Sequence, residues 1–397
     1  MVCDGLEALL PMLEAFEGGQ PDQKVLYVKA PGRTELAGNH TDHEGGHVIA
    51  AALDRYVRGV FRPNGTGVAR LNSAGYGVIE VDLSVLDPQE GEGGSTTALV
   101  RGLAACMAEA GHEPAGFDAA IMSDVPAGSG LSSSAAFEVL VACAMSGLWA
   151  DGSISKEDLA LMSQRAERDW FGKPCGLMDQ AACALGGIQF MSFADPGALE
   201  AQTIDFDFAD CGYEICLTAV GSSHADLIDE YAAVPGEMQA VARACGAERL
   251  ESVLECNFAE QMPELRETYG DRAVLRAIHY FREERLVKER VEALRKGDIQ
   301  SFLNLTRLSG ASSAMYLQNV SMWGTEQPAM IALAAADEML ANKGVSRIHG
   351  GGFGGTIQSF VPVDMVSSFA KGMDFLFGEN ACEAYDIDHE GVCAQWL

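Results

Sequence analysis

Apolar and polar positions in the first half of the chain follow two different periods. Apolar residues recur with helical spacing in four stretches, which predicts helices over residues 6–16, 97–110, 133–149 and 155–171. Short apolar runs bounded by turn residues predict strands over residues 25–30, 57–61 and 117–123. Pro31 and Gly32 are expected to end the first of these strands.

After Gly186 and Gly187 the pattern changes. It predicts strands over residues 188–193 and 213–220, and helices over 236–245, 272–296 and 327–343. A β-like segment around a glycine cluster, residues 346–362, then precedes a helix over 363–377 and a last strand. Because strands and helices do not alternate regularly, we expect an α+β fold, with a second domain beginning near residues 195–210.

Composition narrows the class of protein. A chain of 397 residues has room for about two domains, and no apolar run is long enough to span a bilayer. The start of the sequence lacks the pattern of a signal peptide, and eleven scattered cysteines without a C-x-x-C pair indicate a reducing cytoplasm. The formal net charge of −30 disfavours nucleic acid and anionic membranes as partners, so an anionic substrate needs a local cation, amide cluster or metal.

Residues 124–136 combine a strand exit, a Gly/Ser loop and the start of an apolar helix. Pro126 stops the strand, and two glycines let the backbone approach a bulky group closely. Ser132–Ser134 then supply hydroxyls and free amides at a positive helix N-terminus, which favours an anion such as phosphate. No Lys follows the glycines, so this is not a Walker loop. An ordinary Gly/Ser turn is the alternative.

Residues 30–46 bring Arg, Asn, His and Asp together between glycines, just after a predicted strand. Such a concentration of hydrogen-bonding groups suits a sugar, whose hydroxyls each need a donor and an acceptor. His40, His43 and His47, with Asp42 and Glu44 between them, are alternatively metal ligands of a hydrolase. A metal site usually sets its histidines on a regular element, whereas this segment is glycine-rich. A solvated polar loop is the third interpretation.

Two further segments are less specific. Residues 347–356 contain G-x-G-x-x-G, but the strand-like sequence after the glycines excludes a dinucleotide fingerprint, which needs a helix there. Residues 167–180 end with Asp179 at the head of a small, apolar helix, where an isolated Asp most simply caps the helix.

Together and in this order, the four segments resemble the GHMP family of small-molecule kinases, in particular its galactokinase branch. The first motif of that family typically reads A-P-G-R-V-N-L-I-G-E-H-T-D-Y, and here it is APGRTELAGNHTDH. The second, P-x-G-x-G-L-S-S-S-A, is matched by Pro126–Ala135, and P-C-G-I-M-D-Q by Pro174–Gln180. The third, T-G-G-G-F-G-G, is matched by HGGGFGG from His349.

The resemblance implies a two-domain GHMP kinase fold with the active site between the domains. The first domain, residues 1–205, would be ribosomal-S5-like, and the second, residues 206–397, ferredoxin-like. It implies an ATP- and Mg²⁺-dependent kinase that phosphorylates galactose at the anomeric oxygen, as a monomer or homodimer in the cytoplasm with a small sugar as its partner.

Site residues follow from the same resemblance, position by position. The catalytic residues would be Asp179, as base or orienting carboxylate, and Arg33, which would keep Asp179 ionised and stabilise the transferring phosphoryl group. The ATP phosphates would be held by Gly128, Ser129, Gly130, Leu131, Ser132, Ser133 and Ser134. Magnesium would be bound by Ser134 and Glu167. The sugar would be bound by Asn39, His40, Thr41, Asp42, Gly176 and Tyr231.

The chain departs from the family pattern in places that concern the substrate. Asn39 stands where the family has a Glu that, as the resemblance implies, accepts a hydrogen bond from the C6 hydroxyl. A C6 carboxylate would no longer be repelled there, so galacturonate is an alternative substrate, as is N-acetylgalactosamine. Residues 308–313 also lack the E-S-H-x-S-L-R pattern, and His43 replaces Tyr. A sugar-binding regulator without catalysis is a further alternative, which the retained Arg33 and Asp179 disfavour.

Overall fold

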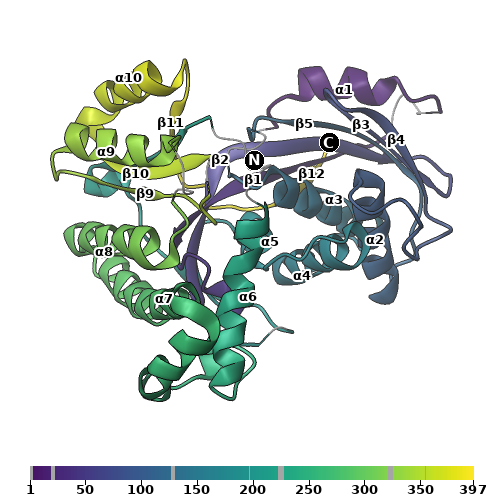
Figure 1. Ribbon diagram of the computed structural model, residues 1–397. Coiled ribbons are helices and arrows are strands. Elements are labelled where there is room, and N and C mark those ends of the chain that lie inside the picture. Colours follow the sequence, from purple (N-terminus) through teal and green to yellow (C-terminus); the bar gives the residue numbers. More distant parts are fainter. Residues whose placement is uncertain are drawn as a thin grey trace.

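The structure is a computed structural model, and it describes residues 3–18, 23–126, 130–195, 197–221, 228–320, 325–353 and 355–397. Gly128 and Ser129 of the expected phosphate loop lie outside these residues. Within the described part of the chain, two β-sheets stand side by side, each with its own helices (Figure 1). The mixed α+β content agrees with the prediction.

The first sheet contains eight of the described strands. Its main path has the order β12-β1-β2-β5-β3-β4, and β6 and β7 extend it from β2. The strands are β1 (Leu26–Ala37), β2 (His47–Pro63), β3 (Val68–Ser73), β4 (Gly77–Asp82), β5 (Phe117–Ser123), β6 (Ile188–Ser192), β7 (Glu200–Ile204) and β12 (Cys393–Trp396). Helix α1 (Leu6–Glu14) covers one face.

The other face of this sheet is covered by a layer of helices (Figure 1). These are α2 (Thr96–Glu109), α3 (Ser133–Trp149), α4 (Lys156–Ala166) and α5 (Met178–Leu185). A π-helical turn, Glu167–Phe171, extends α4. Helices α3 and α5 pack directly on β1 and β2, so their N-termini reach the end of β1 that carries the polar motif. The largest hydrophobic core lies between this helix layer and the sheet.

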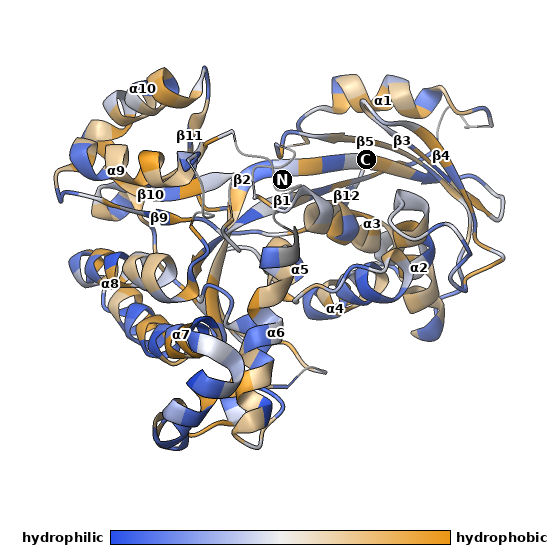
Figure 2. Ribbon diagram, in the orientation of Figure 1, coloured by the Kyte–Doolittle hydropathy of each residue, from blue (hydrophilic) through white to orange (hydrophobic). Residues whose placement is uncertain are grey.

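The second sheet is antiparallel, with the order β11-β8-β10-β9. Its strands are β8 (Tyr213–Ala219), β9 (Val345–Ile348), β10 (Thr356–Pro362) and β11 (Cys382–Tyr385). The helices of this part are α6 (Ile228–Ala244), α7 (Glu255–Arg295), α8 (Ile299–Ser312), α9 (Pro328–Leu340) and α10 (Val366–Phe377). Helix α7, kinked at Gly270, carries many hydrophilic residues (Figure 2), which accords with its largely exposed outer side.

The structure corrects several predicted elements. Strand β1 does not end at Pro31 and Gly32 but continues through them to Ala37, with an irregularity in its pairing to β2 at that point. Strand β2 is much longer than the predicted residues 57–61. Strands β3, β4 and β7 were missed because each contains only two or three apolar residues, and helix α8 was missed although Phe302 and Leu303 are buried.

The last strand of the sequence, β12, lies beside the first, β1. It pairs antiparallel with β1, so residues 393–396 belong to the first sheet although all strands of the second sheet precede them. The division into domains at residues 205 and 206 stays a prediction. None of the helices in the described ranges is long and apolar enough to cross a membrane.

Candidate active site

Arg33 and Asp179 form the centre of the site, where strand β1 meets the first turn of α5. Arg33 Nε and Nη2 each donate to one oxygen of the Asp179 carboxylate, both at 2.7 Å. Arg33 is buried, whereas a third of the Asp179 side chain is exposed and opens onto a cavity. Burial opposes the charge of Asp179, but the Arg33 guanidinium and its hydrogen bonds hold the pKa of this carboxyl below its usual value.

The serine loop closes on this pair from the N-terminus of α3. Ser132 has a left-handed backbone (φ 55°), and its hydroxyl donates to Asp179 instead of capping α3. The Gly130 carbonyl accepts from Arg33 Nη1, and the Leu131 carbonyl accepts from the Arg33 backbone N–H at 3.0 Å. The first-turn amides of α3 therefore face the site without a side-chain cap, which suits an anionic ligand.

Gln180, the neighbour of Asp179 on α5, joins two buried acids from other elements, Glu138 of α3 and Glu167 of the π-helical turn. Gln180 Nε2 donates to two carboxylates, Glu167 at 2.8 Å and Glu138 at 3.0 Å. Lys173 Nζ lies 2.7 Å from the other oxygen of Glu167. Burial, with the neighbouring charge of Glu167, raises the pKa of Glu138 well above its usual value. Gln180 thus joins the two acids, and Lys173 pairs with Glu167.

Next to the Arg33–Asp179 pair lies a cavity of about 190 Å³. Four of the residues expected to bind sugar line it: His40, Asp42, Gly176 and Tyr231. A Cβ at Gly176 would come within 2.4 Å of an Asp42 carboxylate oxygen, so any larger residue would displace that carboxylate from its place in the cavity wall. The Tyr231 ring packs on His40, with 5.2 Å between ring centroids.

His40, one of the residues that line the cavity, has a ring nitrogen left as a free acceptor within the described part of the chain. Its Nε2 lies 2.8 Å from the Gly351 carbonyl, which makes Nε2 the protonated nitrogen. Its Nδ1 has no partner among the described residues. Burial lowers the pKa of His40 to about 3, so the ring is neutral near pH 7.

Asn39 and Thr41 are placed differently from the expectation. Neither lines the cavity, and both side chains are fully buried. Thr41 Oγ1 bonds the Gly38 and His47 carbonyls, which closes the turn between β1 and β2. The amide of Asn39 is used by protein groups, including Asn319 at 2.6 Å and the Gly350 carbonyl. Both side chains thus bond groups of the protein itself, and their role in sugar binding stays a prediction.

The residues expected to bind phosphate and magnesium are only partly placed for these roles. Ser133 and Ser134 begin α3, and Ser134 is exposed. Glu167 is buried and lines the cavity beside Lys173. The interpretation of His40, His43 and His47 as a metal centre is not supported, because His47 bonds Glu284 at 2.8 Å, and the described residues contain no cluster of three or more ligands.

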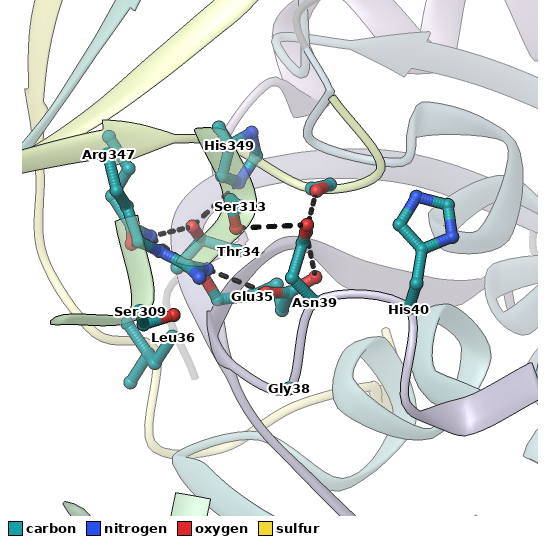
Figure 3. A network of polar contacts seen from close by, with 12 residues as sticks. Thr34, Glu35, Leu36, Gly38, Asn39, His40, Ser309, Ser313, Arg347 and His349 are labelled. Carbon is teal, nitrogen blue, oxygen red and sulfur yellow. Dashed lines mark hydrogen bonds and ion pairs between the residues drawn. The ribbon is translucent and has the colours of Figure 1, made fainter. Parts of the chain in front are cut away.

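Three residues of the site were missed by the sequence analysis. Glu35 lies on the cavity wall and is held by Arg347 of β9, with 2.6 Å between Nη2 and Oε1 (Figure 3). A comparison with the first family motif could have pointed to Glu35, because the family has Asn at the position where this chain has Glu. Glu138 was signalled by its place as the one acidic residue in an apolar helix, four residues after Ser134. Lys173 carried no such signal.

Known proteins resemble the chain over most of its length. The model for the GHMP kinases N terminal domain matches residues 97–187, and that for the galactokinase galactose-binding signature matches residues 14–63. A galactokinase of Streptomyces coelicolor is 31% identical over 355 residues, which is 89% of each chain. The chain belongs to the galactokinase family of GHMP kinases. A galactokinase of Roseiflexus is 33% identical over 86% of this chain and 85% of its own.

Solved structures agree with the family. The Lactococcus lactis galactokinase complexed with galactose has a TM-score of 0.82 and 25% sequence identity, covering 99% of this chain and 100% of its own. A mevalonate kinase, with a TM-score of 0.64 and 16% identity over 92% of this chain and 99% of its own, shares the fold. The predicted GHMP kinase fold and the resemblance to galactokinases are thereby confirmed.

Proposed function

We propose that the protein transfers the γ-phosphoryl group of ATP to the anomeric hydroxyl of galactose, giving galactose 1-phosphate and ADP. The observation that carries this proposal is the Asp179 carboxylate. It is bonded at once to Arg33 and to Ser132 of the phosphate loop, and it opens onto a polar cavity. A sugar hydroxyl in the cavity and a phosphate at the helix N-terminus would meet at this carboxylate.

Asp179 orients the anomeric hydroxyl and accepts its proton late in the transfer. The C1 oxygen forms a bond to the γ-phosphorus while the bond to the ADP oxygen breaks, and the proton passes to the Asp179 carboxylate and then to solvent. The lowered pKa of Asp179 supports this order, because a weak base suits a loose transition state that needs little activation of the nucleophile. Arg33 stabilises the negative charge on the transferring group.

Glu167 and the Ser134 hydroxyl would hold Mg²⁺, which would neutralise phosphate charge during the transfer. The donor set fits a hard cation that prefers oxygen and usually needs only one or two protein groups. The second buried acid, Glu138, lies beside Glu167, and its Oε1 has no partner among the described residues, which leaves a further oxygen donor near the ion.

The alternatives are supported less well. A carboxylate remains on the cavity wall at Glu35 although Asn39 is neutral, which disfavours galacturonate. The intact Arg33–Asp179–Ser132 arrangement disfavours a regulator without catalysis. The scattered cysteines favour a location in the cytoplasm.

An ADP-release assay with Mg²⁺ and ATP tests the proposal on galactose, galacturonate, N-acetylgalactosamine and glucose. We expect the highest kcat/KM for galactose and no release when Mg²⁺ is chelated. Higher activity on galacturonate or N-acetylgalactosamine would refute the proposal that galactose is the substrate. Binding of a sugar, measured by calorimetry, without any ADP release would refute catalysis.

A further inference from the structure

Two positions of the first motif carry exchanged residues. Where the family motif has Asn and, four residues later, Glu, this chain has Glu35 and Asn39. The two side chains are neighbours in the structure, with 3.5 Å between Asn39 Nδ2 and Glu35 Oε2 (Figure 3). A carboxylate and an amide are thus both present, but each occupies the other's position.

The exchange places the carboxylate on the cavity wall. Both residues are buried, at 2% and 0% exposure, but Glu35 lines the cavity and Asn39 does not. Side chains two apart on a strand share one face, so Glu35 lies on the same side of β1 as Arg33, about 7 Å further along. A hexose whose anomeric hydroxyl is at Asp179 would extend along β1 toward Glu35.

The surroundings of Glu35 and Asn39 match this arrangement. Arg347 Nη2 bonds both the Glu35 carboxylate and the Glu35 carbonyl, at 2.6 and 2.9 Å, which neutralises and fixes the acid. The Asn39 amide nitrogen faces the Gly350 carbonyl, a position where a carboxylate oxygen would be repelled. Its amide oxygen accepts from Asn319. A neutral residue at 39 is therefore required once the charge is at 35.

Further departures from the family motifs touch the same cluster. Thr34 replaces Val and His349 replaces Thr, and Thr34 Oγ1 lies 2.9 Å from His349 Nε2 (Figure 3). Gln358 Nε2 joins them by donating to Thr34 Oγ1 at 2.6 Å and to the Glu35 carbonyl at 3.0 Å. The substitutions are thus neighbours in one hydrogen-bonded network between β1 and the second sheet.

We propose that Glu35 contacts the substrate and determines its specificity: its carboxylate, positioned by Arg347, accepts a hydrogen bond from a ring or exocyclic hydroxyl of the hexose. This inference rests on the proposed sugar kinase function. A neutral hexose satisfies the carboxylate, whereas a sugar with a carboxylate at that position has no hydrogen to donate to it.

The first experiment pairs Glu35→Gln with deoxy sugars. We expect this isosteric change to raise KM for galactose about 10- to 100-fold with kcat within about threefold, the range for one hydrogen bond to a charged group. Among 2-, 3-, 4- and 6-deoxygalactose, one sugar should have nearly the same KM in the variant as in the wild type. The hydroxyl that this sugar lacks is the one that contacts Glu35. An unchanged KM, or equal losses for galactose and all four deoxy sugars, would overturn the contact.

The second experiment restores the family letters. We expect Glu35→Asn and Asn39→Glu each to lose activity, the first by leaving Arg347 unpaired and the second by bringing two carboxylates together. The double variant should recover at least about tenfold over the weaker single variant, because one carboxylate is again present. No recovery in a double variant that melts like the wild type would overturn the exchange.

Binding measurements separate this inference from the proposed reaction. If the wild type bound galactose but released no ADP, the reaction would fail while the contact could still be tested by calorimetry. We then expect Glu35→Gln to weaken galactose binding at least about tenfold, and unchanged binding would refute the contact. Asp388→Asn, a change of charge outside the cavity, serves as the matched control and should leave galactose binding unchanged.

Discussion

Replacing Asp179 with Asn removes one negative charge from the site and keeps the size of the side chain. In the native protein this carboxylate accepts three hydrogen bonds, two from Arg33 and one from Ser132. An amide retains one oxygen, so the second N–H group of Arg33 would face an NH₂ group. The change therefore affects both the proton acceptor and the position of the guanidinium.

The expected magnitudes follow from these contacts. Loss of a proton acceptor in the transition state lowers kcat about 10²- to 10⁴-fold. Arg33 is buried and would lose a charged partner, which costs about 1–3 kcal/mol of folding free energy. The larger cost of breaking a fully buried pair does not apply, because a third of the Asp179 side chain is exposed.

The assay compares initial rates of ADP release with the free energy of unfolding in urea. Asp118→Asn is the matched control, since Asp118 is buried against Arg62 and Arg70 on the far part of the first sheet. It should lose stability but keep kcat within about twofold. If Asp179→Asn lost less than about tenfold in kcat, or if both variants lost kcat equally, the role given to Asp179 would be wrong.

Three more predictions follow from the same structure. Gly176→Ala should raise the sugar KM about tenfold or more, since its Cβ would collide with Asp42, and an unchanged KM would contradict that contact. Thr41→Val should lower the melting temperature with kcat and KM unchanged, because the Thr41 hydroxyl bonds only backbone carbonyls. A raised KM would instead indicate that Thr41 binds the sugar. Burial lowers the pKa of His40 and His349 to about 3, so the unfolded chain binds more protons below pH 6.5. The melting temperature should therefore fall as pH decreases from 6.5 to 4, less so in His349→Thr, while kcat/KM shows no step near pH 6.5.

Local patterns predicted the parts of the fold that depend on nearby residues. Helix α3 was placed at its observed residues, because its apolar run follows a serine-rich start and ends near Trp149. The motifs also led to Arg33 and Asp179, which are 146 residues apart in sequence, and the structure places them in contact. That pairing came from the resemblance to a family, since neither residue by itself signals the other.

Features that depend on distant partners were not predictable in this way. Strand β1 passes through Pro31 and Gly32 because β2 pairs with it on both sides of the irregularity, and turn propensity does not report such a partner. The direction of the Asn39 side chain is decided by Asn319 and Gly350, about 300 residues away. Sequence spacing alone could not show that Glu35 lines the cavity and that Asn39 does not.

The pairing of β12 with β1 has a consequence for synthesis of the protein on the ribosome. Residues 393–396 leave the ribosome after every other strand of both sheets, yet they cover one edge of β1. Until then, the backbone groups along that edge of β1 can pair with another chain, as exposed edge strands do. Nascent chains are therefore most exposed to aggregation while the second sheet is being made, and this interval closes only when β12 docks.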